Sequence, residues 1–448
     1  MFKINKNYLI FIFLLFACSF HSQSDFWTKH KTLDKQEELK TLGRTTLYLS
    51  TGQQQFKEIN SAQEISIDSP INNSSWPMPS LNNGNLVNNL KFEGDLNFFF
   101  KRKIGKNRKK LSNTYSSPIH FQNNILFSDN NGNIFNLTDE GELIWHSNIY
   151  KTKDKKIDKR IHKKISYLFY QGNIYCADNL GNLYSLNSEN GEIVWIKNYG
   201  KFFNSKIKII NNKIVLVDQD DAFLLINLED GSLDWSFESQ VSLLKSGFLN
   251  SVAATGTNFI AYTTSSGNIV NIDTKNKNVL WTISGVHLLK GEREDFLKNA
   301  DLVVENEIIY YSNIYRTIAI NLVSGKGIWQ KNFGTYIRPV ISGKYIFILN
   351  NAGHLLCLDK NTGKIIWSKN LFKNFKKRKL KTMQTTGLIM GSGNLYSTTN
   401  NGYIIVVSGK TGEIKKLFKV SESFLTDLII SENKLFALTG SSKLLLFK

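Results

Sequence analysis

Short runs of apolar residues alternate with polar turns along most of this chain, and one arrangement of them returns repeatedly. A short apolar strand is followed by a Gly or Asn turn, a second strand, an acidic or polar turn ending in Gly, and then an apolar pair and a Trp. The copy at residues 172–195 reads GNIYCADNLGNLYSLNSENGEIVW. Its strands alternate with a period of two, which is typical of β-structure. Six copies keep the Trp, at Trp145, Trp195, Trp235, Trp281, Trp329 and Trp367.

Successive tryptophans are 50, 40, 46, 48 and 38 residues apart by subtraction, which is the period of a four-stranded β-propeller blade. A seventh copy has Lys415 in place of Trp, and the eighth, residues 425–448, supplies only three strands. Residues 98–105 match the end of the second copy and are expected to supply the missing outer strand. The sequence therefore predicts an all-β fold, an eight-bladed β-propeller of four-stranded antiparallel blades. Its ring is closed by pairing of an N-terminal strand with the C-terminal blade.

The repeated tryptophans have two interpretations, a ligand cage or the packing of each outer strand against the neighbouring blade. A residue that recurs once per blade serves every blade alike, so we expect packing. Cys176 and Cys357 fall in the second and sixth copies, which face each other across an eight-fold ring at a distance too long for a disulfide. We expect both to be buried strand residues.

The N-terminus has the pattern of an export signal. Two lysines precede the apolar run at residues 8–16, which is too short to span a bilayer. The following Ala17-Cys18 resembles the lipobox of bacterial lipoproteins, in which Cys18 would carry the lipid. The alternative is an ordinary signal peptide with an incidental cysteine.

Three regions follow from this pattern. We predict a lipoprotein signal peptide over residues 1–17, a lipid-anchored flexible tether over 18–90, and the propeller over 91–448. The tether region lacks the repeat and is rich in Ser, Asn and Gln. Near its end, the segment Trp76-Pro77-Met78-Pro79 is a candidate for docking onto the propeller.

The formal charge of +19 is unevenly distributed. Residues 101–110, 151–164 and 373–381 together hold 21 of the 56 Lys and Arg. All three segments lie at or just after a predicted outer strand, and such links emerge on one face of a propeller. We therefore expect one basic face, which would dock an acidic protein, lipid head groups or lipopolysaccharide phosphates, unless the charge serves solubility alone. Nucleic acid is disfavoured by export and by the few aromatics in these segments.

No catalytic or metal-binding motif emerges from the sequence. The seven histidines form no close pair of the HxH or HExxH kind, so no zinc site is indicated. The stretches that begin at Asp129 and Asp218 resemble calcium loops but lack EF-hand spacing and its distal Glu, and they fit hairpin turns. We therefore predict a protein that is not an enzyme, with no catalytic residues, no metal and no cofactor.

The form AxDxxGxLYxLxxxxGxxxW at residues 177–195 resembles the repeat of pyrroloquinoline-quinone (PQQ) dehydrogenases. The enzymes of that superfamily carry a vicinal Cys-Cys pair and metal-binding Glu, Asn and Asp over the cofactor, and this chain has no Cys-Cys. Together, the lipobox, the tether, the WPxP segment and residues 104–145 resemble the BamB family of outer-membrane assembly lipoproteins. The resemblance implies a non-catalytic scaffold of the outer-membrane β-barrel assembly machinery, lipid-anchored to the outer membrane and facing the periplasm.

The resemblance also implies partners. A BamA-like barrel protein would bind through its POTRA domains, unfolded outer-membrane protein precursors are further candidates, and nucleic acid is not expected. A family loop of the form SLxLRG matches the stretch after Trp235, so Leu243, Leu244 and Lys245 are the candidate contacts, with Lys in place of the family's Arg. The family's acidic pair is not cleanly matched near Asp301 and is not assigned. Two alternatives remain open, a periplasmic PQQ-dependent dehydrogenase-like protein and an envelope glycan- or lipid-binding propeller.

Overall fold

A computed structural model describes most of the chain from residue 57 onward. Residues 55–448 form one compact unit. Among the described residues, no helix combines the length and apolar character needed to cross a membrane. The described ranges are 57–61, 65–103, 117–129, 131–150, 164–239, 249–256, 258–284, 298–350, 352–420, 423–424, 426–440 and 443–448.

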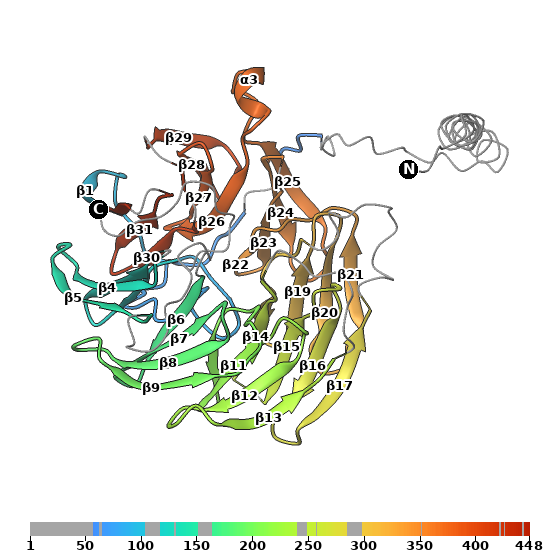
Figure 1. The fold of residues 1–448 in the computed structure, drawn as a ribbon. Helices are drawn as coiled ribbons and strands as arrows, with labels where there is room; N and C mark the ends of the chain where they lie inside the picture. The colour runs from blue at the N-terminus through green and yellow to red at the C-terminus, as the bar shows by residue number, and fades with distance from the viewer. Residues whose placement is uncertain are drawn as a thin grey trace, which may run out of the picture. The chain divides into compact units, whose positions relative to one another are not determined.

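The described part of the chain contains eight four-stranded antiparallel sheets, which confirms the predicted all-β, eight-bladed propeller. Figure 1 shows the blades following one another around a common centre. Blades 1 to 4 are β2 (Ile119–Phe121), β3 (Asn124–Ser128), β4 (Asn133–Thr138) and β5 (Leu143–Asn148); β6 (Ile165–Tyr170), β7 (Asn173–Asp178), β8 (Asn182–Asn187) and β9 (Ile193–Asn198); β10 (Lys208–Ile210), β11 (Lys213–Val217), β12 (Phe223–Asn227) and β13 (Leu233–Phe237); and β14 (Val252–Ala254), β15 (Phe259–Thr263), β16 (Ile269–Asp273) and β17 (Asn278–Ile283).

The second half of the ring repeats the same plan, with one short helix, α3 (Lys377–Leu380), in the link between blades 6 and 7. In every blade the first strand is the innermost and the fourth is the exposed outer one. Blades 5 to 8 are β18 (Val303–Glu305), β19 (Ile308–Ser312), β20 (Thr317–Asn321) and β21 (Gly327–Lys331); β22 (Val340–Ser342), β23 (Tyr345–Leu349), β24 (His354–Asp359) and β25 (Ile365–Asn370); β26 (Thr385–Gly391), β27 (Asn394–Thr399), β28 (Tyr403–Ser408) and β29 (Ile414–Lys419); and β30 (Ile429–Ser431), β31 (Lys434–Leu438), β32 (Lys443–Phe447) and β1 (Phe98–Lys103).

The hairpins are specified by residues that tolerate a positive φ. The turn between β10 and β11 uses Asn211 (φ 51°) and Asn212 (φ 56°), as a two-residue type I′ turn requires. The second turn of the repeat is stabilised by an acidic side chain. Between β3 and β4 of blade 1, Asp129 Oδ1 accepts hydrogen bonds from the backbone N–H of Asn131 (2.9 Å) and Asn133 (3.1 Å). The calcium-like stretch at Asp129 therefore forms a hairpin turn, as expected from its sequence.

Six hydrophobic clusters of the described residues each lie between two consecutive blades, and a seventh joins blades 7, 8 and 1. The cluster between blades 1 and 2, for example, combines Phe121 and Ile134 with Tyr167 and Cys176. Cys176 and Cys357 are both buried and unpaired, which confirms their predicted place in the strands.

The repeated Trp joins neighbouring blades, which confirms the packing interpretation. Trp145 Nε1 donates a hydrogen bond to the Ser188 carbonyl of blade 2 (3.0 Å), and Trp281 Nε1 donates to Leu322 of blade 5 (2.9 Å). The Gly of the next blade's last turn makes room for the indole. A Cβ on Gly191 would lie 2.5 Å from Cε3 of Trp145. The Trp of one blade therefore packs directly on the Gly of the next blade.

This contact predicts a specific cost for Gly191→Ala. Gly191 has a φ of +74°, which by itself costs an Ala about 1–2 kcal/mol, and the new methyl group would also clash with Trp145. Gly172 in the same blade has a φ of +78°, and an added methyl group there would meet nothing within 4 Å, so Gly172→Ala carries the φ cost alone. We expect urea unfolding to show Gly191→Ala at least about 1–2 kcal/mol less stable than Gly172→Ala. Equal losses would mean that the Trp–Gly contact is not tight.

The ring closes as predicted from the sequence. β1 pairs antiparallel with β32, with Lys101 opposite Leu445 and Arg102 opposite Leu444. A second clasp lies nearer the centre, where His120 of blade 1 contacts Ser431 of blade 8 (2.9 Å) and Asp139 of its own blade (2.9 Å). Lys434 of blade 8 forms an ion pair with the same Asp139 carboxylate.

Residues 73–93, called here the axial segment, pass along the inner strands of all eight blades in order (Figure 1). The chain makes one circuit and then becomes β1. The contacts are Glu432 N to Asn73 O (2.7 Å) on blade 8, Trp76 N to His120 O (2.7 Å) on blade 1, Phe169 N to Pro77 O (2.8 Å) on blade 2, Lys208 Nζ to Pro79 O (2.6 Å) on blade 3, Ala254 N to Asn83 O (2.9 Å) on blade 4, Val304 N to Gly84 O (2.8 Å) on blade 5, Ile341 N to Val87 O (3.4 Å) on blade 6 and Leu90 N to Met390 O (3.2 Å) on blade 7.

The axial segment corrects the predicted domain boundary. Residues up to 90 were assigned to a flexible tether, but Trp76, Val87 and Leu90 are at most 3% exposed and belong to the hydrophobic core. The circuit also closes on itself, because Ile71 N donates to Asn89 O (2.8 Å) and Lys91 N donates to Ile71 O (2.8 Å). The backbone is therefore satisfied without a regular sheet, and the compact unit begins near residue 55. The expected docking of the WPxP segment is part of this arrangement.

Candidate functional site

The predicted contact residues Leu243, Leu244 and Lys245 lie outside the described residues, as does the predicted lipid-bearing Cys18. The chain that flanks the first three is described. Outer strand β13 of blade 3 ends at Phe237, and inner strand β14 of blade 4 begins at Val252. These residues therefore belong to a link from an outer strand to the next inner strand, and their roles stay predictions.

One of the three basic segments is described in full. Residues 373–381 form the corresponding link between blades 6 and 7, and all six of their Lys and Arg side chains are exposed. Lys379 donates a hydrogen bond to the hydroxyl of Tyr403 (2.8 Å), which fixes one end of α3 to blade 7. Lys101–Lys103 of another segment lie in β1 itself and are also exposed. A single basic face across all three segments stays a prediction.

The outer edge of blade 6 is covered by the chain itself. Ile59 and Ser368 of β25 exchange two backbone hydrogen bonds of 3.0 Å, as a short antiparallel addition to the sheet. Glu58 lies 3.3 Å from Lys373 in an ion pair, and Glu58 also accepts a hydrogen bond from the backbone N–H of Asn370 (3.1 Å). The hydrogen bond from Asn370 is the main cause that lowers the pKa of Glu58. Glu58 and Ile59 thus lie beside the basic link.

Where the chain enters the inner strands, the repeat places a polar or charged residue in seven blades and a Gly in one. Each stands five residues before the turn that follows its inner strand. We call this set the axial ring. Its members in blades 1 to 8 are Ser117, Ser166, Lys206, Asn250, Asp301, Arg338, Gly387 and Asp427.

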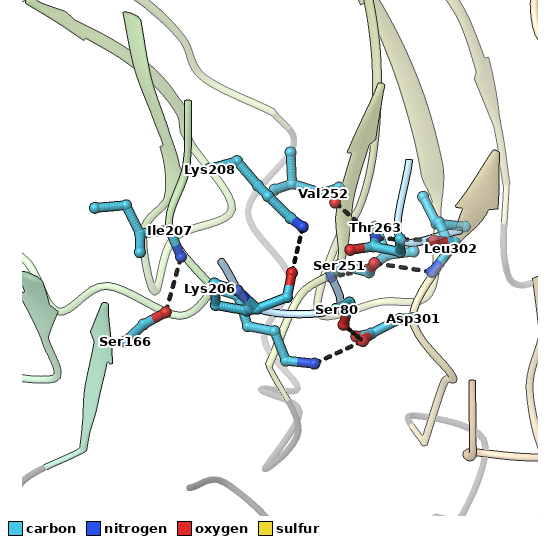
Figure 2. A network of polar contacts seen from close by, with 12 residues as sticks. Ser80, Ser166, Lys206, Ile207, Lys208, Ser251, Val252, Thr263, Asp301 and Leu302 are labelled. Carbon is cyan, nitrogen blue, oxygen red and sulfur yellow. Dashed lines mark hydrogen bonds and ion pairs between the residues drawn. The ribbon is translucent and has the colours of Figure 1, made fainter. Parts of the chain in front are cut away.

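Figure 2 shows the best-connected part of the axial ring. Lys206 of blade 3 reaches past blade 4 to Asp301 of blade 5, with Nζ 2.6 Å from Oδ2. Ser80 of the axial segment donates a hydrogen bond to the same oxygen (2.8 Å). Burial raises the pKa of Asp301, but the charge and hydrogen bond of Lys206 and the hydrogen bond of Ser80 outweigh it and lower this pKa to about 2. Asp301 is therefore a carboxylate held in place by Lys206 and Ser80.

The neighbouring Lys208 shows how the axial segment and the ring are joined. It is 1% exposed, and its Nζ donates hydrogen bonds to the carbonyls of Pro79 and Asn82 (2.6 Å each). Burial lowers the pKa of Lys208 well below its ordinary value. The side-chain amide nitrogen of Asn85, also in the axial segment, donates hydrogen bonds to the carbonyls of Val252 (2.9 Å) and Leu302 (2.8 Å).

Within the described residues, one group of His, Asp and Glu has a spacing that suits a metal ion, namely His120, Asp139 and Glu432. Both ring nitrogens of His120 already have partners, and Asp139 is bound by His120 and by Lys434. Burial raises the pKa of Asp139, but the hydrogen bonds from these two residues outweigh it, so the pKa lies below its ordinary value. These contacts explain the group as the clasp between blades 1 and 8.

An eight-bladed ring of four-stranded blades, whose repeat ends in a Trp packed on the Gly of the next blade, defines the class of PQQ-like β-propellers. The sequence places the chain within this class. Residues 130–369 match the family model described as outer membrane protein assembly factor BamB, and the chain belongs to that family.

Individual relatives are distant. The outer membrane protein assembly factor BamB of Shewanella oneidensis is 21% identical over 266 residues, which is 58% of this chain and 64% of that protein. This chain thus spans less than two thirds of that relative's length. The crystal structure of BamB from Moraxella catarrhalis is 12% identical with a TM-score of 0.62, over 79% of this chain and 99% of that one. A quinohemoprotein alcohol dehydrogenase from Comamonas testosteroni is 9% identical with a TM-score of 0.64, over 83% and 80% of the two chains, and shares the fold.

Proposed function

We propose that this protein is a non-catalytic scaffold lipoprotein of the machinery that assembles β-barrel proteins in the outer membrane. It is anchored through Cys18, faces the periplasm, and binds a BamA-like barrel protein through Leu243, Leu244 and Lys245. The observation that carries the proposal is the BamB family match over residues 130–369, which includes the proposed contact residues. Its action is positioning rather than chemistry.

The arrangement of the ring's centre supports a scaffold rather than an enzyme. Three of the charged side chains there are engaged in structural contacts: Asp301 binds Lys206 and Ser80, and Lys208 binds two backbone carbonyls. The axial segment also fastens the inner strands of all eight blades to one another. A ring fastened in this way holds the ends of its strands in fixed relative positions, which lowers the entropy cost of binding a partner.

The test is affinity recovery of the full-length lipidated protein from detergent-solubilised envelope. We expect the wild type to recover a BamA-like barrel protein and the Leu243→Asp, Leu244→Asp double variant to recover at least tenfold less, because two charges replace apolar contacts at the interface. The matched control is Leu233→Asp with Leu280→Asp, which places the same charges on two outer-strand leucines that are 49% and 38% exposed. The Cys18→Ala variant is expected to leave the membrane fraction but to keep its partner in detergent.

Equal loss of recovery in the contact and control variants would contradict the assigned contact residues. If the wild type recovers no barrel protein, the scaffold proposal itself is overturned. Quinone titration and binding to envelope glycan or lipid, the latter weakened steeply by salt, would then test the two alternative functions.

A further inference from the structure

Arg338 is a buried cation whose guanidinium has no hydrogen-bond partner among the described residues. The residue is 3% exposed, and its Nε, Nη1 and Nη2 atoms are all buried and unbonded. A guanidinium has five N–H donors, and leaving all of them without an acceptor in a buried place costs several kcal/mol. Such a group calls for an acceptor beside it, for example a water or an ion.

The position of Arg338 in the axial ring shows where that acceptor would lie. Blade 7, next to Arg338, has Gly387 at the ring position, and blade 8 has Asp427. A Cβ on Gly387 would lie 2.6 Å from Oδ1 of Asp427, so the Asp427 carboxylate occupies the space that a side chain at residue 387 would fill. On its other side Arg338 has Asp301 of blade 5, whose carboxylate is already bound by Lys206 and Ser80.

The charges around Arg338 leave its positive charge incompletely matched. Asp301 interacts electrostatically with both Arg338 and Lys206, so one carboxylate serves two cations. Burial raises the pKa of Asp427, against the partial opposing effect of Arg338 and Lys206, which weakens Asp427 as a counter-ion. The side chains of Lys206 and Asp301 are 27% and 15% exposed, so solvent reaches this level of the ring.

We propose that the axial ring binds a small oxyanion, either inorganic phosphate or a carboxylate, through the guanidinium of Arg338 with Lys206 as the second cation. A planar guanidinium group binds two oxygens of such an anion at the same time. Arg338 offers this group at a level of the ring that solvent reaches. Bound there, the anion supplies the acceptors that Arg338 lacks and balances the second cation. The site is independent of the proposed scaffold function and of the residues assigned to partner binding.

The test is calorimetric titration of the wild-type protein with sodium phosphate and, separately, with sodium acetate, each against chloride at fixed ionic strength. Fixed ionic strength keeps the general attraction of anions to a chain of formal charge +19 equal in all titrations. We expect saturable binding of one of the two anions, which identifies the source. Arg338→Gln should weaken it at least tenfold, since a bidentate charged pair is lost. Arg378→Gln removes the same charge from exposed α3 and should leave the affinity unchanged.

A second measurement keeps the proposal testable if Arg338→Gln does not fold. Crystals of the wild-type protein soaked in selenate should show an anomalous peak beside the Arg338 guanidinium. Selenate only at surface lysines, or no saturable binding of either anion, would overturn the proposal and assign the donors of Arg338 to water. Equal weakening by Arg338→Gln and Arg378→Gln would overturn it as well.

Discussion

Leu445→Asp is expected to prevent the ring from closing and to leave the protein unfolded or aggregated at 25 °C. Leu445 is 0% exposed and lies in β32, between Lys101 of β1 and Ala437 of β31. The substitution removes a buried leucine, at a cost of about 2–5 kcal/mol, and adds a carboxyl group without a partner, at a cost of several more. The sum reaches the whole stability of an ordinary domain.

The matched control is Leu417→Asp, which makes the same change on outer strand β29, where the leucine is 51% exposed. We expect this control to change the free energy of unfolding by about 0.5 kcal/mol or less. Far-UV circular dichroism and the soluble yield of the two variants, followed by urea unfolding where a folded state exists, decide the matter. A Leu445→Asp protein with a wild-type unfolding midpoint would mean that closure through β1 and β32 does not hold the ring together.

The closure could be predicted from the sequence because it follows from an incomplete copy of a repeat. Three strands at the C-terminus and an unmatched strand at residues 98–105 imply one another, and β1 pairs with β32 accordingly. The packing of the repeated Trp against the neighbouring blade could be predicted for a similar reason, since the Trp recurs at the same place in six of the eight copies. Periodicity therefore reveals the contacts that every blade shares.

The axial segment could not be predicted, because its contacts have no period. It is held by hydrogen bonds to all eight blades, seven of them through the backbone and one through Lys208 Nζ, and its stretch LNNGNLVNNL at residues 81–90 has the composition of a linker. The signal in the sequence was the spacing of apolar residues within this polar stretch, such as Val87, Leu90 and Phe92, which are all buried. A close approach also marks it, since a Cβ on Gly84 would lie 2.7 Å from the carbonyl oxygen of Val304.

The axial ring was missed for a different reason. Lys206, Asp301, Arg338 and Asp427 occupy equivalent positions of the repeat, but their residue types differ from blade to blade. A search for what the copies share removes such positions, whereas an alignment of the copies on their hairpin turns brings them together. In this propeller, the axial ring is found by aligning the eight copies and comparing the charge of the residues at one aligned position.

Trp76→Ala is expected to show that the axial segment is part of the cooperative fold. Trp76 is 1% exposed, and its backbone exchanges two hydrogen bonds with His120 (2.7 and 3.0 Å). Removal of a buried indole costs about 3–5 kcal/mol, and here it also loosens the start of the circuit around the inner strands. We therefore expect urea unfolding to occur at a clearly lower midpoint, with residues 73–93 more open to limited proteolysis.

Trp76→Phe is the control, because Nε1 of Trp76 has no hydrogen-bond partner among the described residues, so that Phe keeps an aromatic ring and loses no hydrogen bond. It should cost clearly less than Trp76→Ala. If the axial segment were instead an independent tether, Trp76→Ala would leave the unfolding midpoint unchanged and raise cleavage only within residues 73–93. A shift of the global transition, matched by easier cleavage in distant blades, is the result expected if the axial segment unfolds together with the blades.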